Sequence, residues 1–181
     1  MGVIAKPLPD MKYLEECFYV NFETGELIWK HRPDTHFRNE QIARGVNAKY
    51  AGKVAGMTNS KTRYRYVWMD SVAYKVHRII WKMKLGADPL HEIDHINGDR
   101  TDNRIENLRD CTKSQNQMNV RVRANSASGL KNIKFRKDRW YVRITVDGTR
   151  KHVGCFLTKQ QAIDEYAKCE QEYYGDYARR A

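Results

Sequence analysis

Residues 91–119 contain the side chains whose types and spacing could do chemistry. Asp94 and His95 are adjacent, and Asn107 and Asn116 follow at 12 and 21 residues after His95. A carboxylate and an amide oxygen are ligands that Mg²⁺ or Mn²⁺ prefers. An imidazole with an ordinary pKa near ~6.5 can take a proton from water at neutral pH. One metal ion beside such a base is chemistry for phosphodiester hydrolysis, and Asn107 could fix the imidazole by a hydrogen bond.

Two short strands, a loop and a helix must position these residues. Asn97-Gly98-Asp99 is a turn signal between extended segments that we predict over His91–Ile96 and Ile105–Cys111. The pattern Thr112-Lys-Ser-Gln115 is a capping box, which predicts a helix from about Lys113. Adjacent residues of a regular strand point to opposite faces, so the Asp-His pair can share one site only where its strand ends or twists.

The same residue types also occur in ordinary structural roles. An Asp-His dipeptide is common, and asparagine often merely caps a helix or turns the chain. All four spaced residues, together with the turn and the capping box, favour a functional site over this alternative. His91 and His77 are more ambiguous, and we expect a structural role or a DNA-backbone contact for each before direct chemistry.

The stretch IDHINGDRTDNRIENLRDCTKSQN resembles the HNH nuclease motif, also called the ββα-metal motif. The form is similar to that of phage and intron-encoded homing endonucleases, and ETGELIWK and YKVHRIIW resemble the front half of the phage enzymes. The resemblance implies that Asp94 and Asn116 bind the metal, that His95 is the general base and that Asn107 is the structural asparagine. Many family members have histidine at the third motif position, so Asn116 fits Mg²⁺ (Mn²⁺ being possible) and argues against zinc.

The composition favours a polyanionic partner. The 181 residues carry a formal net charge of +11, which predicts nucleic acid, here double-stranded DNA, ahead of a membrane surface. No run approaches the ~18 apolar residues of a spanning helix, so we expect no membrane partner. The four cysteines are scattered without a CxxC pair, which favours a reducing, cytoplasmic setting, the host cytoplasm if a phage encodes the chain. No small-molecule cofactor is indicated.

A basic, aromatic stretch covers residues 44–84. Alternation in TRYRYVWMD places Tyr64, Tyr66 and Trp68 on one face of a strand and the arginines on the other. We expect the aromatic face to pack in the core and the arginine face to contact phosphates, although a merely solvated face is the alternative. Four residues of this stretch are the expected DNA contacts: Arg63, Arg65, His77 and Arg78.

The last part of the chain predicts three strands and a helix, over Leu130–Phe135, Arg139–Val146 and Arg150–Phe156 and then after the capping box Thr158-Lys-Gln-Gln161. SGLKNIKF, WYVRITVDGTRKHVGCF and AIDEYAKCEQEYYGDYA resemble the AP2 DNA-binding domain. The resemblance implies a sheet docked in the major groove of DNA; the alternative is a sheet kept soluble by its charges. The residues at contact positions are Lys131, Lys134, Arg136, Arg143, Arg150 and His152.

The predicted fold class is α+β, with an HNH nuclease domain over 1–123, a linker over 124–128 and an AP2-like domain over 129–181. Further elements are expected earlier in the chain: a helix over Leu8–Val20 beginning near Asp10, a strand over Glu26–His31, strands within Arg63–Val76 and a helix over His77–Leu85. The predicted function is a homing-type, metal-dependent DNA endonuclease that nicks as a monomer. The alternatives are a non-catalytic DNA-binding regulator with a nuclease-derived fold and an RNA-directed nuclease.

Overall fold

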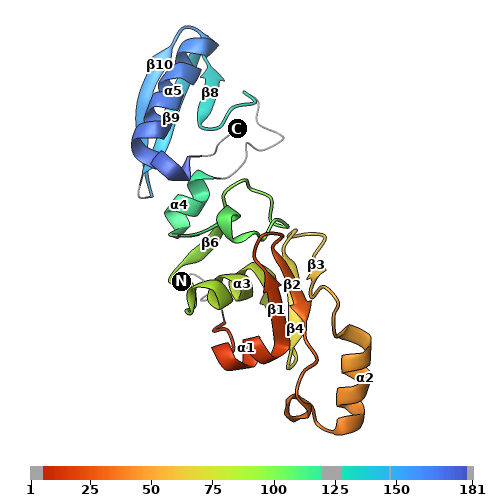
Figure 1. Cartoon of the computed structure of the whole chain (residues 1–181). Helices are drawn as coiled ribbons and strands as arrows, with labels where there is room; N and C mark the ends of the chain where they lie inside the picture. Colours follow the sequence, from red (N-terminus) through yellow and green to blue (C-terminus); the bar gives the residue numbers. More distant parts are fainter. Residues whose placement is uncertain (1–5, 120–127, 147, 179–181) are drawn as a thin grey trace. The chain divides into compact units, whose positions relative to one another are not determined.

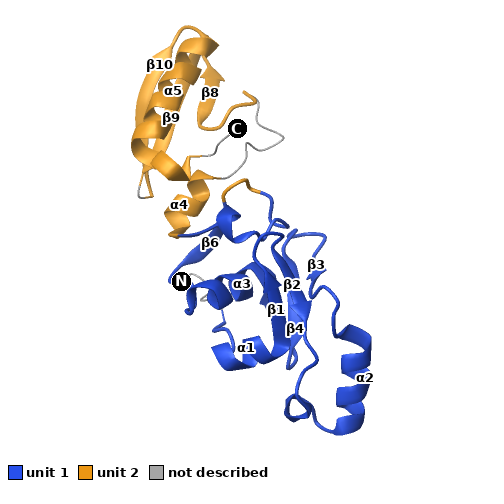
Figure 2. Cartoon of the chain, viewed as in Figure 1, with its two compact units in different colours: residues 1–95, 99–110 blue, residues 96–98, 111–181 orange. Residues whose placement is uncertain are grey.

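The computed structural model describes residues 6–119, 128–146 and 148–178 (Figure 1). Contacts divide the chain into two compact units (Figure 2). The first unit is Met1–His95 with Asp99–Asp110, and the second is Ile96–Gly98 with Cys111–Ala181. Helices and small antiparallel sheets occur together, which confirms the α+β class. The linker predicted over 124–128 lies outside the described residues except for Ser128.

The first unit, together with the strand that ends it, contains the following elements: α1 (Met11–Cys17), β1 (Phe18–Asn21), β2 (Glu26–Trp29), η1 (Asp34–His36), α2 (Glu40–Tyr50), β3 (Met57–Thr58), β4 (Arg65–Met69), β5 (Val72–Lys75), α3 (Val76–Leu85), β6 (Glu92–His95), η2 (Ile105–Asn107) and β7 (Leu108–Cys111). Three antiparallel sheets have the orders β1-β2, β3-β4-β5 and β6-β7. One apolar core joins α1, the β1–β2 hairpin, β4 and α3.

The helix predicted over Leu8–Val20 begins as expected but ends early. The side chain of Asp10 caps α1 by accepting from the backbone N–H of Tyr13 at 2.8 Å. The helix stops at Cys17 because the next four residues form β1, which pairs with β2. β-branched and aromatic residues in that segment favour the strand, and pairing with β2 decides against helix propensity.

The expectation that the aromatic face of β4 lies in the core was wrong. Val67 and Met69 are buried, whereas the side chain of Trp68 is 67% exposed. Both alternating sets of RYVWM contain apolar residues, so periodicity alone could not choose between the faces. Val67 and Met69 pack with the buried residues of α3 in the core, which leaves Tyr66 and Trp68 on the opposite, open face.

Strand, strand and helix follow one another around the HNH-like motif in the predicted order. β6 ends at His95, which meets the condition under which the adjacent Asp94 and His95 could contribute to one site. The second segment differs at its start, because Ile105–Asn107 form the 3₁₀ turn η2 and only Leu108–Cys111 pair as β7. The capping box predicted at Thr112 is present and begins the helix α4.

The second unit contains α4 (Lys113–Met118), β8 (Ile133–Arg136), β9 (Arg139–Val146), β10 (Thr149–Phe156), α5 (Lys159–Tyr174) and η3 (Gly175–Tyr177). The sheet has the order β10-β9-β8, and α5, begun by the predicted capping box at Thr158, lies along one face (Figure 1). Val142 and Ile144 are buried on that face, as the alternation in β9 predicted. The pairing of β10 with β9 shifts between His152 and Gly154, and Val153 at this irregularity packs into the core.

Candidate active site

His95 is the last residue of β6 and is only 2% exposed. Its Nε2 lies 3.1 Å from Oδ1 of Asn103. An amide oxygen only accepts, so this hydrogen bond places the imidazole hydrogen on Nε2 and the lone pair on Nδ1. Burial lowers the pKa of His95, while the bond to Asn103 acts in the opposite sense. The imidazole is therefore neutral near neutral pH, which is the form that a general base needs.

Asn103 is a site residue that the sequence did not single out. It is 1% exposed and belongs to the loop between β6 and β7. The turn between β1 and β2 supports this loop: Gly25 has φ +70, and a Cβ added there would meet the backbone of Asn103 and Arg104. The backbone N–H of Ile105 also donates to the carbonyl of Phe22 at 3.4 Å. The glycine of ETGELIWK was the signal in the sequence for this contact, because only a residue without a Cβ lets the two backbones approach so closely.

Asn107 is buried and donates from Nδ2 to the backbone carbonyl of Asp102 at 2.8 Å. The side chain of Asp102 in turn accepts from Nε and Nη2 of Arg104 at 2.9 and 2.8 Å. These bonds fix the backbone on both sides of Asn103. Asn107 thus holds the loop that carries the partner of His95. The direct hydrogen bond from Asn107 to the imidazole, which the sequence suggested, stays a prediction.

Asp94 is 6% exposed and faces Arg109 of β7. Its Oδ2 accepts from Nη2 and Nε of Arg109 at 2.7 and 3.0 Å. A buried carboxylate needs such a partner because an unpaired charge is costly to bury. Both of these bonds end on Oδ2, and a carboxylate has about four lone-pair sites in all.

The carboxylate of Asp94 is a group of the kind that binds hard metal ions. Among residues 6–119, 128–146 and 148–178, no three His, Cys, Asp or Glu side chains are grouped so that they could hold a metal. Mg²⁺ does not require such a cage, since it keeps several waters and takes one or two protein oxygens together with substrate phosphate. The carboxylate of Asp94 in the first unit and the amide of Asn116 in the second each offer oxygen of the kind that this mode of binding uses.

Two further rings surround His95. His77 of α3 is 3% exposed, and its ring meets that of His95 edge-on, with centroids 5.0 Å apart. Tyr64 lies 5.1 Å from His77 and 5.9 Å from His95 between ring centroids. Burial, and next the nearby His95, lower the pKa of His77 well below its ordinary value. The structure therefore places His77 in the interior, packed against His95. The sequence had left a structural role and a DNA-backbone contact open for His77, and burial favours the structural role.

Asn116 belongs to the second unit, in the first turn of α4. Its backbone N–H donates to the carbonyl of Thr112 at 2.9 Å, within the capped start of the helix. Asn119, which the sequence did not single out, ends this helix and donates from Nδ2 to the carbonyl of Ile96 at 3.3 Å. It is 4% exposed, so the bond fixes the end of α4 on the segment that follows β6.

The expected DNA contacts of the first unit have different environments. Arg63 is exposed at a turn. Arg65 donates to the carbonyls of Ala55 and Gly56 at 3.3 and 3.5 Å, and Arg78 donates to the carbonyl of Lys6 at 2.9 Å. Arg65 and Arg78 therefore have structural partners, whereas the guanidinium of Arg63 lies at the surface.

The open face of the C-terminal sheet is basic. Arg143 pairs with His152 and Thr145 with Arg150 across β9 and β10, so these side chains share the face opposite α5. Lys131 is placed differently, because its Nζ contacts the carbonyl of Met118 and lies near Glu170 of α5. The exposed basic residues of the open face are Lys134, Arg136, Arg139, Arg143, Arg150 and His152.

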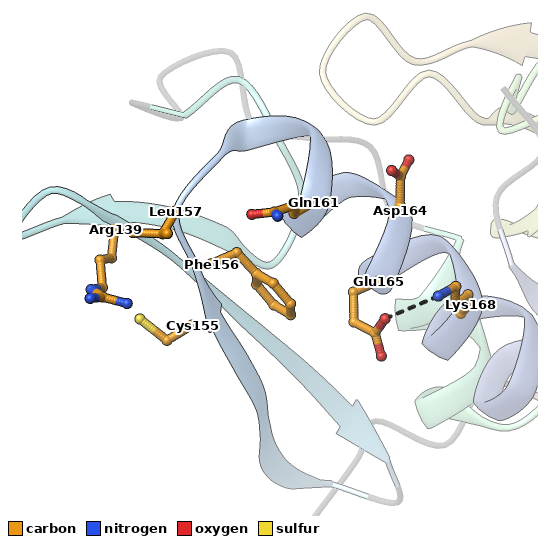
Figure 3. A pocket seen from close by; sticks show the side chains of 8 residues that line it. All are labelled: Arg139, Cys155, Phe156, Leu157, Gln161, Asp164, Glu165 and Lys168. Atoms are coloured by element: carbon orange, nitrogen blue, oxygen red, sulfur yellow. Dashed lines mark hydrogen bonds and ion pairs between the residues drawn. The ribbon is translucent and has the colours of Figure 1, made fainter.

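A hollow of the second unit lies beside the start of α5 (Figure 3). Phe156 and Gln161 line it, together with Cys155 and an ion pair of Lys168 with Glu165 at 3.4 Å. Its charges are mixed and it contains neither Asp94 nor His95. This hollow is therefore not the candidate active site.

Part of this chain is similar to the HNH endonuclease family. Residues 74–118, which include all four motif residues, match the sequence model of the HNH endonuclease family. The chain is similar to Protein 3.8 of Escherichia phage T7, with 26% identity over 106 residues that cover 57% of this chain and 87% of that protein. No solved structure matches the chain. The match to the HNH endonuclease family suggests nuclease activity on DNA.

Within residues 6–119, 128–146 and 148–178, no helix is both long enough and apolar enough to cross a membrane. α5, the longest at 16 residues, carries charged side chains along its length.

Proposed function

We propose that this chain is a metal-dependent DNA endonuclease of the homing type, in which His95 draws a proton from the attacking water. The observation that carries the proposal is the bond from His95 Nε2 to Asn103, which leaves the lone pair of a neutral imidazole on Nδ1. Asn107 keeps the loop of Asn103 in place. The similarity to a phage protein supports an origin in a phage and action in the host cytoplasm.

Asp94 and Asn116 would hold the metal, Mg²⁺ ahead of Mn²⁺ and not zinc. Bound there, the ion would polarise the scissile phosphate and stabilise the leaving oxygen. Arg109 orients Asp94 and offsets part of its charge before the ion and the phosphate arrive. The role of Asn116 rests on its position in the motif and on the oxygen that its amide offers.

The C-terminal unit would recognise the target site. Its open basic sheet face suits the major groove, where Lys134, Arg136, Arg143, Arg150 and His152 would contact phosphates or base edges. Lys131, with its structural contacts, is the weakest of the proposed contacts. The resemblance of this unit to the AP2 domain supports this assignment, and one active site per chain supports nicking by a monomer.

The test is nicking of supercoiled plasmid DNA with Mg²⁺, followed by gel electrophoresis. We expect nicking by the wild-type chain, loss of nicking in His95→Ala, and full nicking in His31→Ala, whose exposed side chain follows β2 and lies outside the motif. Undiminished nicking by His95→Ala would refute the assigned base. A wild-type protein that binds DNA but never nicks it, with either metal, would indicate a non-catalytic regulator. Preferential cutting of RNA would indicate an RNA-directed nuclease.

A further inference from the structure

Two cations lie against the ring of Tyr64, close to the base. Lys75 Nζ is 4.4 Å and the guanidinium carbon of Arg100 is 4.8 Å from the ring centroid. The same ring is 5.9 Å from that of His95. Cation–π contacts fix the place of a positive charge without neutralising it. We call Tyr64, Lys75 and Arg100 the Tyr64 clamp.

The charges of the Tyr64 clamp have no carboxylate partner. In the described ranges, neither Lys75 nor Arg100 forms an ion pair, whereas Arg104 and Arg109 in the same unit each pair with an aspartate. The printed bond of Arg100 goes from Nη1 to the carbonyl of Thr62 at 3.0 Å, and a guanidinium has five donors. Two fixed cations that form no ion pair are a suitable site for an anion.

Electrostatics agrees with this geometry. Burial lowers the pKa of Lys75, and the charge of Arg78 adds to the effect, while Glu92 acts in the opposite sense. Bringing a phosphate group to Lys75 and Arg100 would relieve the repulsion between like charges. The like charges around Lys75 therefore favour an anionic ligand at this site.

The Tyr64 clamp continues into the open face of the β3-β4-β5 sheet. Lys75 is paired with Tyr66 across β5 and β4, and Trp68 follows two residues further on the same face. Trp68 is 67% exposed, and Met57, paired with Tyr66 from β3, is 82% exposed. Exposed aromatic rings beside fixed cations match a nucleic acid strand, whose bases stack on rings while its phosphates meet the charges.

We propose that Lys75 and Arg100, held on Tyr64, bind phosphates of the DNA strand next to the bond that is cut, and that Tyr66 and Trp68 receive the adjoining nucleotides. The inference rests on the proposed function in taking DNA as the substrate of His95. The sequence suggested that the arginine face of the β3-β4-β5 sheet contacts DNA. This inference assigns the contact to the aromatic face of the same sheet. Tyr64 then links phosphate binding to the position of the base.

The test measures the binding of a mixed-sequence DNA duplex by fluorescence anisotropy, without divalent metal, between about 50 and 200 mM salt. Each phosphate contact that is lost should reduce the slope of log K against log salt by about 0.9. We expect that reduction in Lys75→Gln and in Arg100→Gln. Arg44→Gln is the matched control, since Arg44 is an exposed cation of α2 with a side chain 82% accessible; its slope should match that of the wild type.

A second pair of variants tests the aromatic face. The probe here is a single-stranded oligonucleotide of mixed sequence, because the bases of a duplex are already stacked on one another. Trp68→Ser should weaken its binding about ten-fold without changing the salt slope, because stacking releases no counterions. Tyr19→Ser is its control, since Tyr19 is an exposed aromatic residue of β1 (58%) away from the clamp. Thermal unfolding would verify that each variant is folded.

The outcomes separate this inference from the proposed function. Wild-type slopes in folded Lys75→Gln and Arg100→Gln would overturn the clamp, even if the wild-type protein nicks DNA. Equal reductions in Arg44→Gln would also overturn it, because they would reflect overall charge alone. Clamp-dependent binding by a wild-type protein that never nicks would refute the proposed function and leave the clamp standing.

Discussion

Replacement of Gly25 by alanine should damage the active site from a distance. Gly25 has φ +70, a conformation that costs an alanine about 1 kcal/mol relative to glycine. A Cβ there would lie 2.9 Å from the carbonyl oxygen of Asn103 and still closer to the carbonyl carbon of Asn103 and the nitrogen of Arg104. These are backbone atoms, so the loop itself has to move.

The size of the movement decides the effect on chemistry. Ordinary contacts begin near 3.4 Å, so the backbone at Asn103 must retreat by on the order of 1 Å. The bond of Asn103 to His95 is 3.1 Å long and cannot survive a displacement of that size away from the ring. A misplacement of ~1 Å at a catalytic group lowers rates by about 10²-fold, and we expect a loss of this order in the nicking rate.

Gly52→Ala provides the matched control. Gly52 has φ +77, but a Cβ there would meet nothing within 4 Å. Both variants should therefore lose about 1 kcal/mol of unfolding free energy from backbone strain, and only Gly25→Ala should lose more and nick slowly. Urea unfolding and single-turnover nicking would measure the two effects. Equal nicking by the two variants would refute the claim that the β1–β2 turn positions Asn103.

Four other substitutions test the site and its supports. Asn103→Leu should reduce nicking about 10- to 100-fold through loss of one buried hydrogen bond, and plasmid assays showing wild-type rates would contradict that role. Arg109→Leu should cost about 3–5 kcal/mol in urea unfolding, because Asp94 is left buried without its partner; a loss below ~1 kcal/mol would argue against this pairing. His77→Phe should flatten the pH dependence of stability: the pKa of His77 is lowered by burial, so the unfolded chain takes up its proton first as pH falls below about 6.5, at up to ~1.4 kcal/mol per pH unit. Unfolding curves near pH 7.5 and 5.5 would show whether that slope persists. Met118→Ala should destabilise the second unit by about 2–3 kcal/mol in thermal or urea unfolding, since Met118 is buried in its core, and an unchanged midpoint would exclude that packing.

Helices and strands were predicted well from the sequence where their physical cause lies within a few residues of chain. The two capping boxes, at Thr112 and Thr158, begin helices because the side chains satisfy backbone N–H groups only three residues away. The inward face of β9 followed from strict alternation, since Trp140, Val142 and Ile144 have polar residues between them.

Other features depended on contacts that no local pattern encodes. α2 was missed because its buried residues are only Ala43 and Asn47, which leaves a weak apolar stripe in a polar segment. The prediction of which face of β4 is buried was wrong because both of its alternating sets contain apolar residues. Asn103 lies in the polar run DRTDNR, where asparagine is an ordinary turn residue, and its bond to His95 exists only in the folded chain.

The contacts of His95 distinguish positioning of the base from binding of the substrate. Gly25 acts on the imidazole through Asn103, and His77 packs against it from α3; neither holds a free charge that DNA could meet. Lys75 and Arg100 do hold such charges, and they reach His95 only through the ring of Tyr64. Changes at the first pair should therefore slow cutting while the salt dependence of DNA binding stays as it is, because no phosphate contact is lost. Changes at the second pair should alter both, since the group that binds the strand also touches the base.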